Sequence, residues 1–321
     1  MFKIAYLKAT YFRSALIPLF CILVIALQLI MGCVKKVQRV DTNFRSSLRN
    51  PPTYRRGDGP VVWIDEAHHN IVATKGRYEP FVEVLLRDGY VVEAFQSTFT
   101  AESLIDIGLL VIGNARHPRT VFNEDLPTSS AFTTDEIEAV YNWVSEGGAL
   151  LLLADHMPFA GAASDLGKKF GFEFNNGYVV DPNLWDPTVF NLDDGTLVDH
   201  MITRGLSERE IVKSVGTYIG QAFRSVDADP LMVLGPNYVS YTPEKAWDIK
   251  EESPYIEVTG WLQGAVKHVG EGRIAVFGDA TMFSAQLSSE DMPIGMNSPE
   301  SKENIQFLLN VLHWLTGKLD R

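Results

Sequence analysis

The hydrophobic pattern from Val61 onward alternates short apolar runs with longer amphipathic ones, which is typical of βα units around a parallel sheet. Strands are predicted over 61–65, 90–95, 107–115 and 149–154, and helices over 77–89 and 133–148. The run "ALLLLA" at 149–154 does not alternate, so we expect a central strand that is buried on both faces.

A less regular stretch follows at 175–258, where Asp, Asn, Gly and Pro are frequent and the strand-like pieces are short. We interpret it as a strand-rich insertion packed on the same sheet. A short helix with a serine near its N-cap is expected before it, over 163–174. The regular pattern returns with a buried strand over 272–284 and a final helix over 301–317. The pattern therefore predicts a single α/β domain over residues 60–321.

The N-terminal region has the layout of an export signal: three basic residues precede an apolar run at 16–31. The run ends in "LIMGC", which resembles a bacterial lipobox and would make Cys33 the lipidated residue of the mature protein. An uncleaved signal anchor is the alternative, because the run is about as long as a short membrane span. Either way we expect residues 1–33 to direct the chain to the bacterial cell envelope, where the domain is anchored to a membrane outside the cytoplasm.

Charge divides unevenly along the chain. Ten of the 28 Lys and Arg residues lie in residues 1–59 with only two acids, which leaves 18 basic and 38 acidic residues in the domain. An acidic body repels phosphate backbones, so nucleic acid is not an expected partner. The basic stretch 34–59, interrupted by Pro51 and Pro52, is predicted to be a tether near the lipid surface.

Polar residues follow three of the predicted strands. The carboxyl ends of parallel strands share one edge of a sheet, and ligands of open α/β sheets bind there. We therefore expect these side chains to form a site rather than isolated turns. They are Asp65, Glu66, His68, His69 and Asn70 after the first strand, Asp155 and His156 after "ALLLLA", and Asp279 and Ser284 after "IAVFG", in the loop that ends the segment 272–284. Arg116 in "NARHP" follows another strand and is a candidate anion contact.

Two chemistries fit this set of residues. Asp65, His68, Asp155 and His156 have donors suited to zinc, manganese or iron, and such a divalent metal would activate a water for hydrolysis with Asp279 or Glu66 as base. Without a metal, Asp would orient His, and His would act as a general base or bind a polar ligand. The spacing does not decide between them. The ligand-binding candidates at this edge are Glu66, His69, Asn70, Arg116 and Ser284.

The segments "WIDEAHHN", "GGALLLLADHMPFAG", "FGDATMFS" and "NIQFLLNVLHWLTG" together resemble the DUF4350 family and, more distantly, the class I glutamine amidotransferase-like fold. The resemblance implies a flavodoxin-like parallel sheet flanked by helices. That fold group includes amidotransferases, trehalose-utilisation-like proteins, and non-catalytic modules of gliding-motility and intraflagellar-transport proteins. The amidotransferases present a cysteine after a central strand. Here Asp155 and His156 stand there, and the only cysteines, Cys21 and Cys33, lie in the signal region, so the resemblance does not extend to glutaminase chemistry.

We expect a membrane-anchored envelope lipoprotein whose domain binds a small polar molecule or glycan at the Asp/His edge. Aromatic faces such as Trp63 or Trp185 would then lie beside the ligand. A metal-assisted hydrolase using the same cluster is the close alternative, and a non-catalytic assembly module is the third. The sequence specifies no protein partner.

Overall fold

The computed structural model describes residues 37–121, 126–184 and 187–320. The predicted signal region with Cys33 lies outside them, as does Trp185. Among the residues that the structure describes, none of the helices is both long and apolar enough to cross a membrane.

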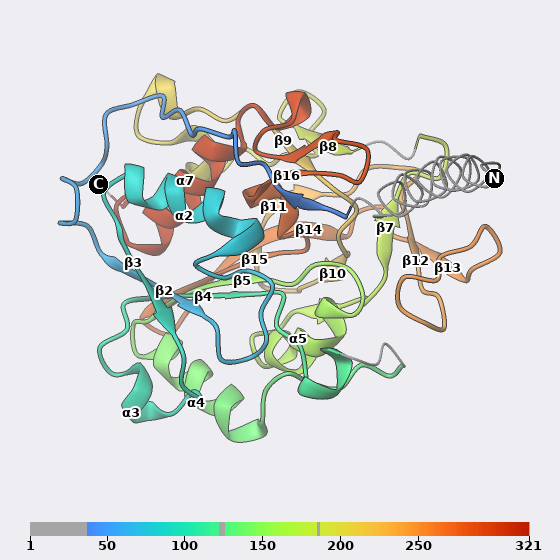
Figure 1. Cartoon of the computed structure of the whole chain (residues 1–321), viewed down its shortest axis with the longest axis horizontal. Helices are drawn as coiled ribbons and strands as arrows, with labels where there is room; N and C mark the ends of the chain where they lie inside the picture. Colours follow the sequence, from blue (N-terminus) through green and yellow to red (C-terminus); the bar gives the residue numbers. More distant parts are fainter. Residues whose placement is uncertain (1–36, 122–125, 185–186, 321) are drawn as a thin grey trace, which may run out of the picture.

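A mixed sheet of nine strands forms the centre of the molecule (Figure 1). Five neighbouring strands are parallel, in the order β3-β2-β4-β5-β15, and the sheet continues from β15 through antiparallel strands. The parallel strands are β2 (Val61–Asp65), β3 (Val91–Phe95), β4 (Leu109–Gly113), β5 (Ala149–Leu153) and β15 (Gly272–Phe277). The antiparallel strands are β14 (Leu262–Val269), β10 (Phe223–Arg224), β6 (Glu173–Phe174) and β11 (Asp229–Val233). The predicted parallel sheet is thus confirmed for five strands and extended by an antiparallel part.

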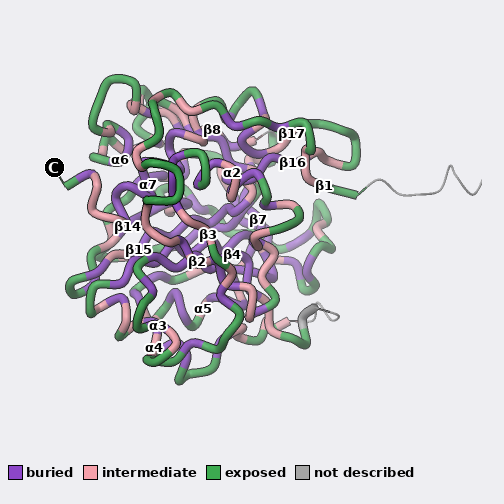
Figure 2. Tube along the Cα trace, turned by 60° about the vertical axis from the view of Figure 1, so that its left-hand side comes forward, coloured by how far each residue is buried: buried purple, intermediate pink, exposed green. Residues whose placement is uncertain are grey.

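Helices cover both faces of this sheet. In Figure 1, α2 (Glu79–Arg87) and α7 (Asn304–Leu315) lie on one side, and α3 (Ala101–Leu104), α4 (Thr134–Ser145) and α5 (Phe159–Lys169) lie on the other. Two hydrophobic cores result, because successive strand residues point to opposite faces: Leu151 packs with the α7 side and Leu152 with the α4 side. Figure 2 shows the buried residues concentrated along the central strands.

Local sequence explains where α4 begins. Thr133 accepts a hydrogen bond from the backbone N–H of Glu136, and the Glu136 side chain accepts one from the backbone N–H of Thr133, which is a capping box. Helix α5 differs from the prediction, since it begins at Phe159 rather than near Ser164 and ends at Lys169. The apolar and small residues at 159–163 continue its buried face, so tertiary burial extends the helix beyond the serine that suggested a cap.

The region at 175–258 folds into short strands beside the large sheet. One small sheet has the order β13-β12-β7 and another pairs β8 with β9. These elements are β7 (Tyr178–Val180), β8 (Thr188–Asn191), β9 (Ser214–Thr217), β12 (Val239–Tyr241), β13 (Tyr255–Glu257) and the short helix α6 (Met201–Arg204). The expected strand-rich insertion is therefore present, and its segment β10 also joins the large sheet.

The predicted basic tether packs along the domain from Arg39 to Tyr54. Strand β1 (Arg39–Val40) pairs with β16 (Ala285–Leu287), which pairs in turn with β17 (Pro293–Gly295). Further along, Arg49 forms an ion pair with Glu303 at 2.8 Å. Basic composition predicted a tether near the lipid surface, whereas Arg39 and Arg49 form ion pairs with carboxylates of the acidic domain. The segment is thus ordered by contacts that its own sequence does not reveal.

Candidate functional site

The predicted convergence of strand ends is present at the carboxyl edge of the parallel strands. Asp65 ends β2, Asn114 follows β4, Asp155 lies two residues after β5, and Asp279 lies two residues after β15. All four are buried. Because these strands are neighbours in the sheet, their polar ends form one continuous row.

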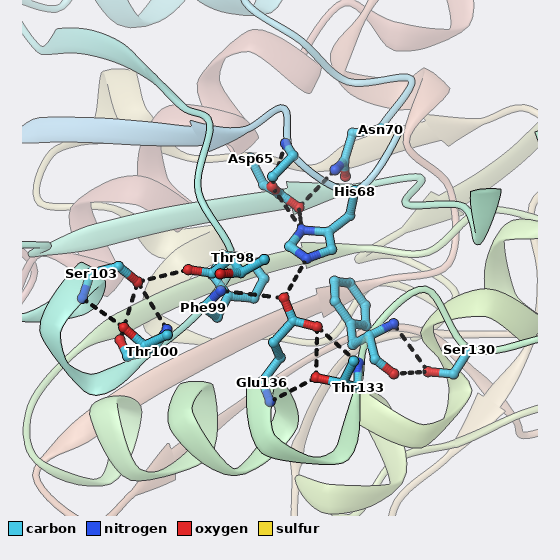
Figure 3. A network of polar contacts seen from close by, with 12 residues as sticks. Asp65, His68, Asn70, Thr98, Phe99, Thr100, Ser103, Ser130, Thr133 and Glu136 are labelled. Atoms are coloured by element: carbon cyan, nitrogen blue, oxygen red, sulfur yellow. Dashed lines mark hydrogen bonds and ion pairs between the residues drawn. The ribbon is translucent and has the colours of Figure 1, made fainter.

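His68 is held between two carboxylates at one end of the row (Figure 3). Its Nδ1 lies 2.9 Å from Asp65 Oδ2, and its Nε2 lies 3.0 Å from Glu136 Oε1. The ring stacks on Phe99 with centroids 4.6 Å apart and contacts the neighbouring Phe132 at 4.9 Å. Burial acts to lower the pKa of His68, but the hydrogen bonds and negative charges of Asp65 and Glu136 outweigh it and raise that pKa. With a carboxylate oxygen at each ring nitrogen, the protonated form of His68 donates from both nitrogens and ties β2 to α4.

Hydrogen bonds hold the loop after β2 against the end of β4. Asn70 donates to Asp65 Oδ2 at 2.7 Å and accepts from the backbone N–H of Gly113 at 3.0 Å. Glu66 accepts from the hydroxyl of Thr74 at 2.6 Å and from its backbone N–H at 2.8 Å. Burial acts to raise the pKa of Glu66, but the Thr74 hydrogen bonds outweigh it and lower that pKa. These predicted ligand-binding residues thus hold the loop in place.

A second group lies where β5 and β15 end. Asp279 Oδ2 accepts from the backbone N–H of Tyr218 at 2.6 Å, and its Oδ1 accepts from that of Thr281 at 2.7 Å. Burial, and next the negative charge of Asp155, raise the pKa of Asp279 well above its ordinary value. Burial, and next the negative charges of Asp155 and Asp279, raise the pKa of Tyr78. The buried Tyr78 hydroxyl forms a hydrogen bond with the side chain of Thr281. The protonated form of Asp279 is therefore favoured at this buried position beside Asp155.

His156 lies beside Asp155 in a cluster of aromatic rings. It stacks on Tyr178 with centroids 4.8 Å apart, and it meets Trp247 edge to face at 4.7 Å and Phe159 at 5.9 Å. Its Nδ1 lies 2.8 Å from the carbonyl oxygen of Met157, which makes Nδ1 a donor. Its Nε2, 3.9 Å from Asp155 Oδ1, faces that carboxylate without a close contact. Asp155, His156 and the exposed Trp247 thus form a half-buried corner beside the row of polar strand ends.

Three other predicted residues have clear positions. Ser284 is buried, donates to the carbonyl oxygen of Thr281 and accepts from Gln286, so it stabilises the turn after β15. His69 is exposed and left-handed, with φ 49°. Arg116 is half-buried and donates from Nε to the carbonyl oxygen of His69 at 3.2 Å.

The predicted metal set of Asp65, His68, Asp155 and His156 does not come together. Over residues 37–121, 126–184 and 187–320, no group of three or more His, Cys, Asp or Glu side chains is arranged to hold a metal ion. Both nitrogens of His68 already face carboxylates, and His156 turns toward the aromatic rings. The prediction assumed that side chains after neighbouring strands face one another, whereas each loop turns its histidine toward a different partner.

Sequence reasoning missed four residues that shape this edge: Glu136, Tyr78, Tyr178 and Trp247. Glu136 lies in the acidic first turn of α4, and its capping-box position is the signal that the sequence offers. Trp247 and Tyr178 lie in the irregular insertion, where no periodic pattern pointed to the site. The predicted Trp63 lies elsewhere, lining a cavity of about 460 Å³ with Gln96 and Ser97 beyond the end of β3.

No protein-family model and no curated protein matches the chain. Solved structures do match. The mmIFT52 N-terminal domain is 17% identical with a TM-score of 0.56, covering 79% of this chain and 97% of that domain. A ThuA-like protein from Bacteroides uniformis is 12% identical with a TM-score of 0.45, covering 85% of this chain and 94% of that one. A cytoplasmic protein from Salmonella typhimurium LT2 is 15% identical with a TM-score of 0.44, covering 81% and 98%. The likeness to the mmIFT52 domain shows a shared fold.

Proposed function

We propose that the protein binds a small polar ligand of the sugar type at the corner formed by Asp155, His156 and Trp247. The observation that carries the proposal is the half-exposed indole of Trp247, 51% exposed, set edge to face against His156 at the end of a central strand. A sugar ring has an apolar face that packs on an indole and hydroxyl groups that require hydrogen-bond partners. The corner offers both kinds of contact side by side.

The backbone at Trp247 supports this proposal. Its φ is 70°, a left-handed conformation that is rare for a bulky residue. The backbone N–H of Trp247 donates to the hydroxyl of Tyr178 at 2.7 Å, which itself donates to the carbonyl oxygen of Met157 at 3.0 Å. Strained backbone that surrounding contacts hold in place is found most often at binding and active sites. The indole is therefore fixed in position before any ligand arrives, which reduces the entropic cost of binding.

The finer fold assignment belongs to the same proposal. We infer a flavodoxin-like, amidotransferase-like domain, because the five parallel strands taken in chain order follow the arrangement 2-1-3-4-5. Asp155 and His156 follow the strand after which the amidotransferase resemblance implies a cysteine, and residues 34–321 contain no cysteine. Binding without glutaminase chemistry is the function consistent with these residues.

The test is a glycan screen on the full-length protein, which is purified in a detergent without a sugar head group. Each saccharide that binds in the screen is then measured by isothermal titration calorimetry. We expect at least one saccharide to bind, and Trp247→Ala to weaken it roughly tenfold through loss of the stacked face. The matched control is Tyr255→Ala. Tyr255 lies on β13, is similarly exposed at 57%, and packs its ring on Tyr241 rather than on His156. Equal affinity of the Trp247 variant and the wild type would contradict the proposal.

We further propose that the domain is held at a membrane of the cell envelope through lipid on Cys33, at the end of the lipobox-like segment "LIMGC". The support is the basic, apolar and Gly-Cys order of residues 1–33. We expect the wild type to incorporate labelled palmitate and to fractionate with membranes. Cys33→Ser should lose the label, while Cys21→Ser should keep it. Label on the Cys33 variant would exclude this anchor.

A further inference from the structure

Strand β3 is an end strand of the large sheet, and its outer edge is unprotected. In the part of the chain that the structure describes, β2 is the only strand that pairs with it (Figure 1). It has five residues in unbroken register with β2 and contains no proline, glycine or lysine. The opposite side of the sheet differs, because β6 has only two residues and β11 contains Pro230 and two register shifts. Since short strands, prolines and bulges are what prevent a further strand from adding to an edge, β3 is the edge that can accept one.

The backbone of β3 has donors and acceptors that point away from the sheet. The backbone N–H of Val91 donates to the carbonyl oxygen of Pro60, just before β2, at 3.2 Å. In a parallel pair of strands, alternate residues direct their backbone groups to the same neighbour. Residues 91, 93 and 95 therefore face β2, whereas the N–H and C=O groups of Val92 and Ala94 face outward. These groups can bond an extended segment in the way that β-augmentation requires.

A cavity of about 460 Å³ lies against this edge, between the end of β3 and the end of α3. Trp63 and Phe95 line it, with ring centroids 6.5 Å apart. Ile105, which ends α3, also lines it with a side chain that is 80% exposed. Because Ala94 lines the same cavity, the cavity is continuous with the outward-facing backbone. A strand added to β3 would therefore place a side chain beside these apolar groups, and their burial would favour binding.

The rim of this cavity is acidic. Glu102 and Asp106 line it, whereas no lysine or arginine of the described residues does. Glu93 adds a third carboxylate, because its register with Trp63 places its exposed side chain on the same face of the sheet. Over residues 37–121, 126–184 and 187–320, none of the three forms an ion pair with a lysine or arginine. The larger cavity beside α2 is lined by two acidic and two basic residues, so the imbalance is particular to the β3 edge.

We propose that the β3 edge binds an extended basic segment of a partner protein as an additional strand. This protein-binding function goes beyond the sugar site, which lies at the end of β5. Side chains of an added strand alternate between the two faces of the sheet, so a residue beside Phe95 enters the cavity and a residue two positions away lies beside Glu93. An apolar residue and a lysine or arginine two positions apart are therefore recognised together. A second copy of β3 is disfavoured, since it would bring its own Glu93 to the acidic rim.

The experiment is a selection from a random peptide library displayed on phage, with the full-length protein in detergent as the target. Selected peptides are labelled with fluorescein and titrated by fluorescence polarisation. We expect a lysine or arginine two positions from an apolar residue to recur among them. A selected peptide should bind Glu102→Lys/Asp106→Lys roughly tenfold more weakly, because attractive charges become repulsive. Val92→Pro should weaken it similarly, since proline removes an outward N–H without removing a bond to β2.

The matched control is Glu271→Lys/Glu290→Lys, which makes the same charge change at two exposed turns and should bind the peptide as the wild type does. Circular dichroism and thermal unfolding establish that each variant is folded, and the charge variant alters only exposed side chains. Trp247→Ala should leave peptide binding unchanged whether or not a sugar binds, so this test and that of the sugar site are separate.

Three results would overturn the proposal. The first is a selection that enriches no peptide with the basic and apolar pair. The second is a selected peptide that binds either folded β3-edge variant as tightly as the wild type. The third is a dimer of the wild type, seen by analytical ultracentrifugation, that Val92→Pro converts to a monomer, because a second copy of the chain would then occupy the edge.

Discussion

His68→Ala is expected to lower the free energy of unfolding by about 3–5 kcal/mol, the typical cost of removing one partner from a buried ion pair. The variant leaves Asp65 fully buried without its cation, takes a partner from Glu136, and opens space between Phe99 and Phe132. Chemical denaturation at pH 6 measures the change. A loss below about 1 kcal/mol, within the range of exposed ion pairs, would show that the imidazolium does not stabilise the fold.

The control for this variant is the adjacent histidine. His69 is exposed and left-handed, a conformation that asparagine tolerates, so His69→Asn should change stability by less than about 0.5 kcal/mol. The pH dependence gives a second check. Since the pKa of His68 is raised in the folded state, its stabilisation is complete below the unfolded pKa of about 6.5 and is lost as pH rises through the folded value. His68→Ala should lack that decline.

Asp279 is expected to make the protein less stable as pH rises from about 4, the ordinary range of an aspartate in the unfolded chain. Burial and the charge of Asp155 raise its folded pKa, so the folded state holds a proton that the unfolded chain releases. In that window stability falls by about 1.4 kcal/mol per pH unit, until pH passes the folded pKa. The sign is the opposite of the usual one for a carboxylate whose pKa is lowered by an ion pair.

The measurement is the free energy of unfolding at intervals from pH 4 to 8 for the wild type and Asp279→Asn. The amide cannot ionise, so the variant should lose less stability than the wild type across this range, whatever its stability at pH 4. Asp193→Asn, an exposed turn residue, should keep the wild-type slope. If Asp279→Asn declines as steeply as the wild type, the proton is not held by Asp279. The loss of stability caused by His68 begins near pH 6.5. Below that pH, the difference in slope between the wild type and Asp279→Asn therefore reports the contribution of Asp279.

The sequence by itself determined the elements whose pattern follows from local rules. The unalternating apolar run at 149–154 predicts a strand buried on both faces, and it forms β5. The Thr133 and Glu136 spacing set the start of α4, because a capping box involves only neighbouring residues. The position of Asp65, Asp155 and Asp279 at one edge also followed from sequence, since parallel strands end on the same side of a sheet.

Tertiary structure decided what those side chains do. The direction of a side chain after a strand depends on the loop that carries it. His68 therefore faces Glu136, 68 residues away, and His156 faces Trp247, 91 residues away. The capping box at Glu136 indicates only the start of α4, and no local pattern marks Trp247. The packed segment at 39–54 likewise depends on distant partners, which are carboxylates such as Glu303. Period and capping are local properties of the chain, whereas pairing, burial and charge compensation arise only when distant segments meet.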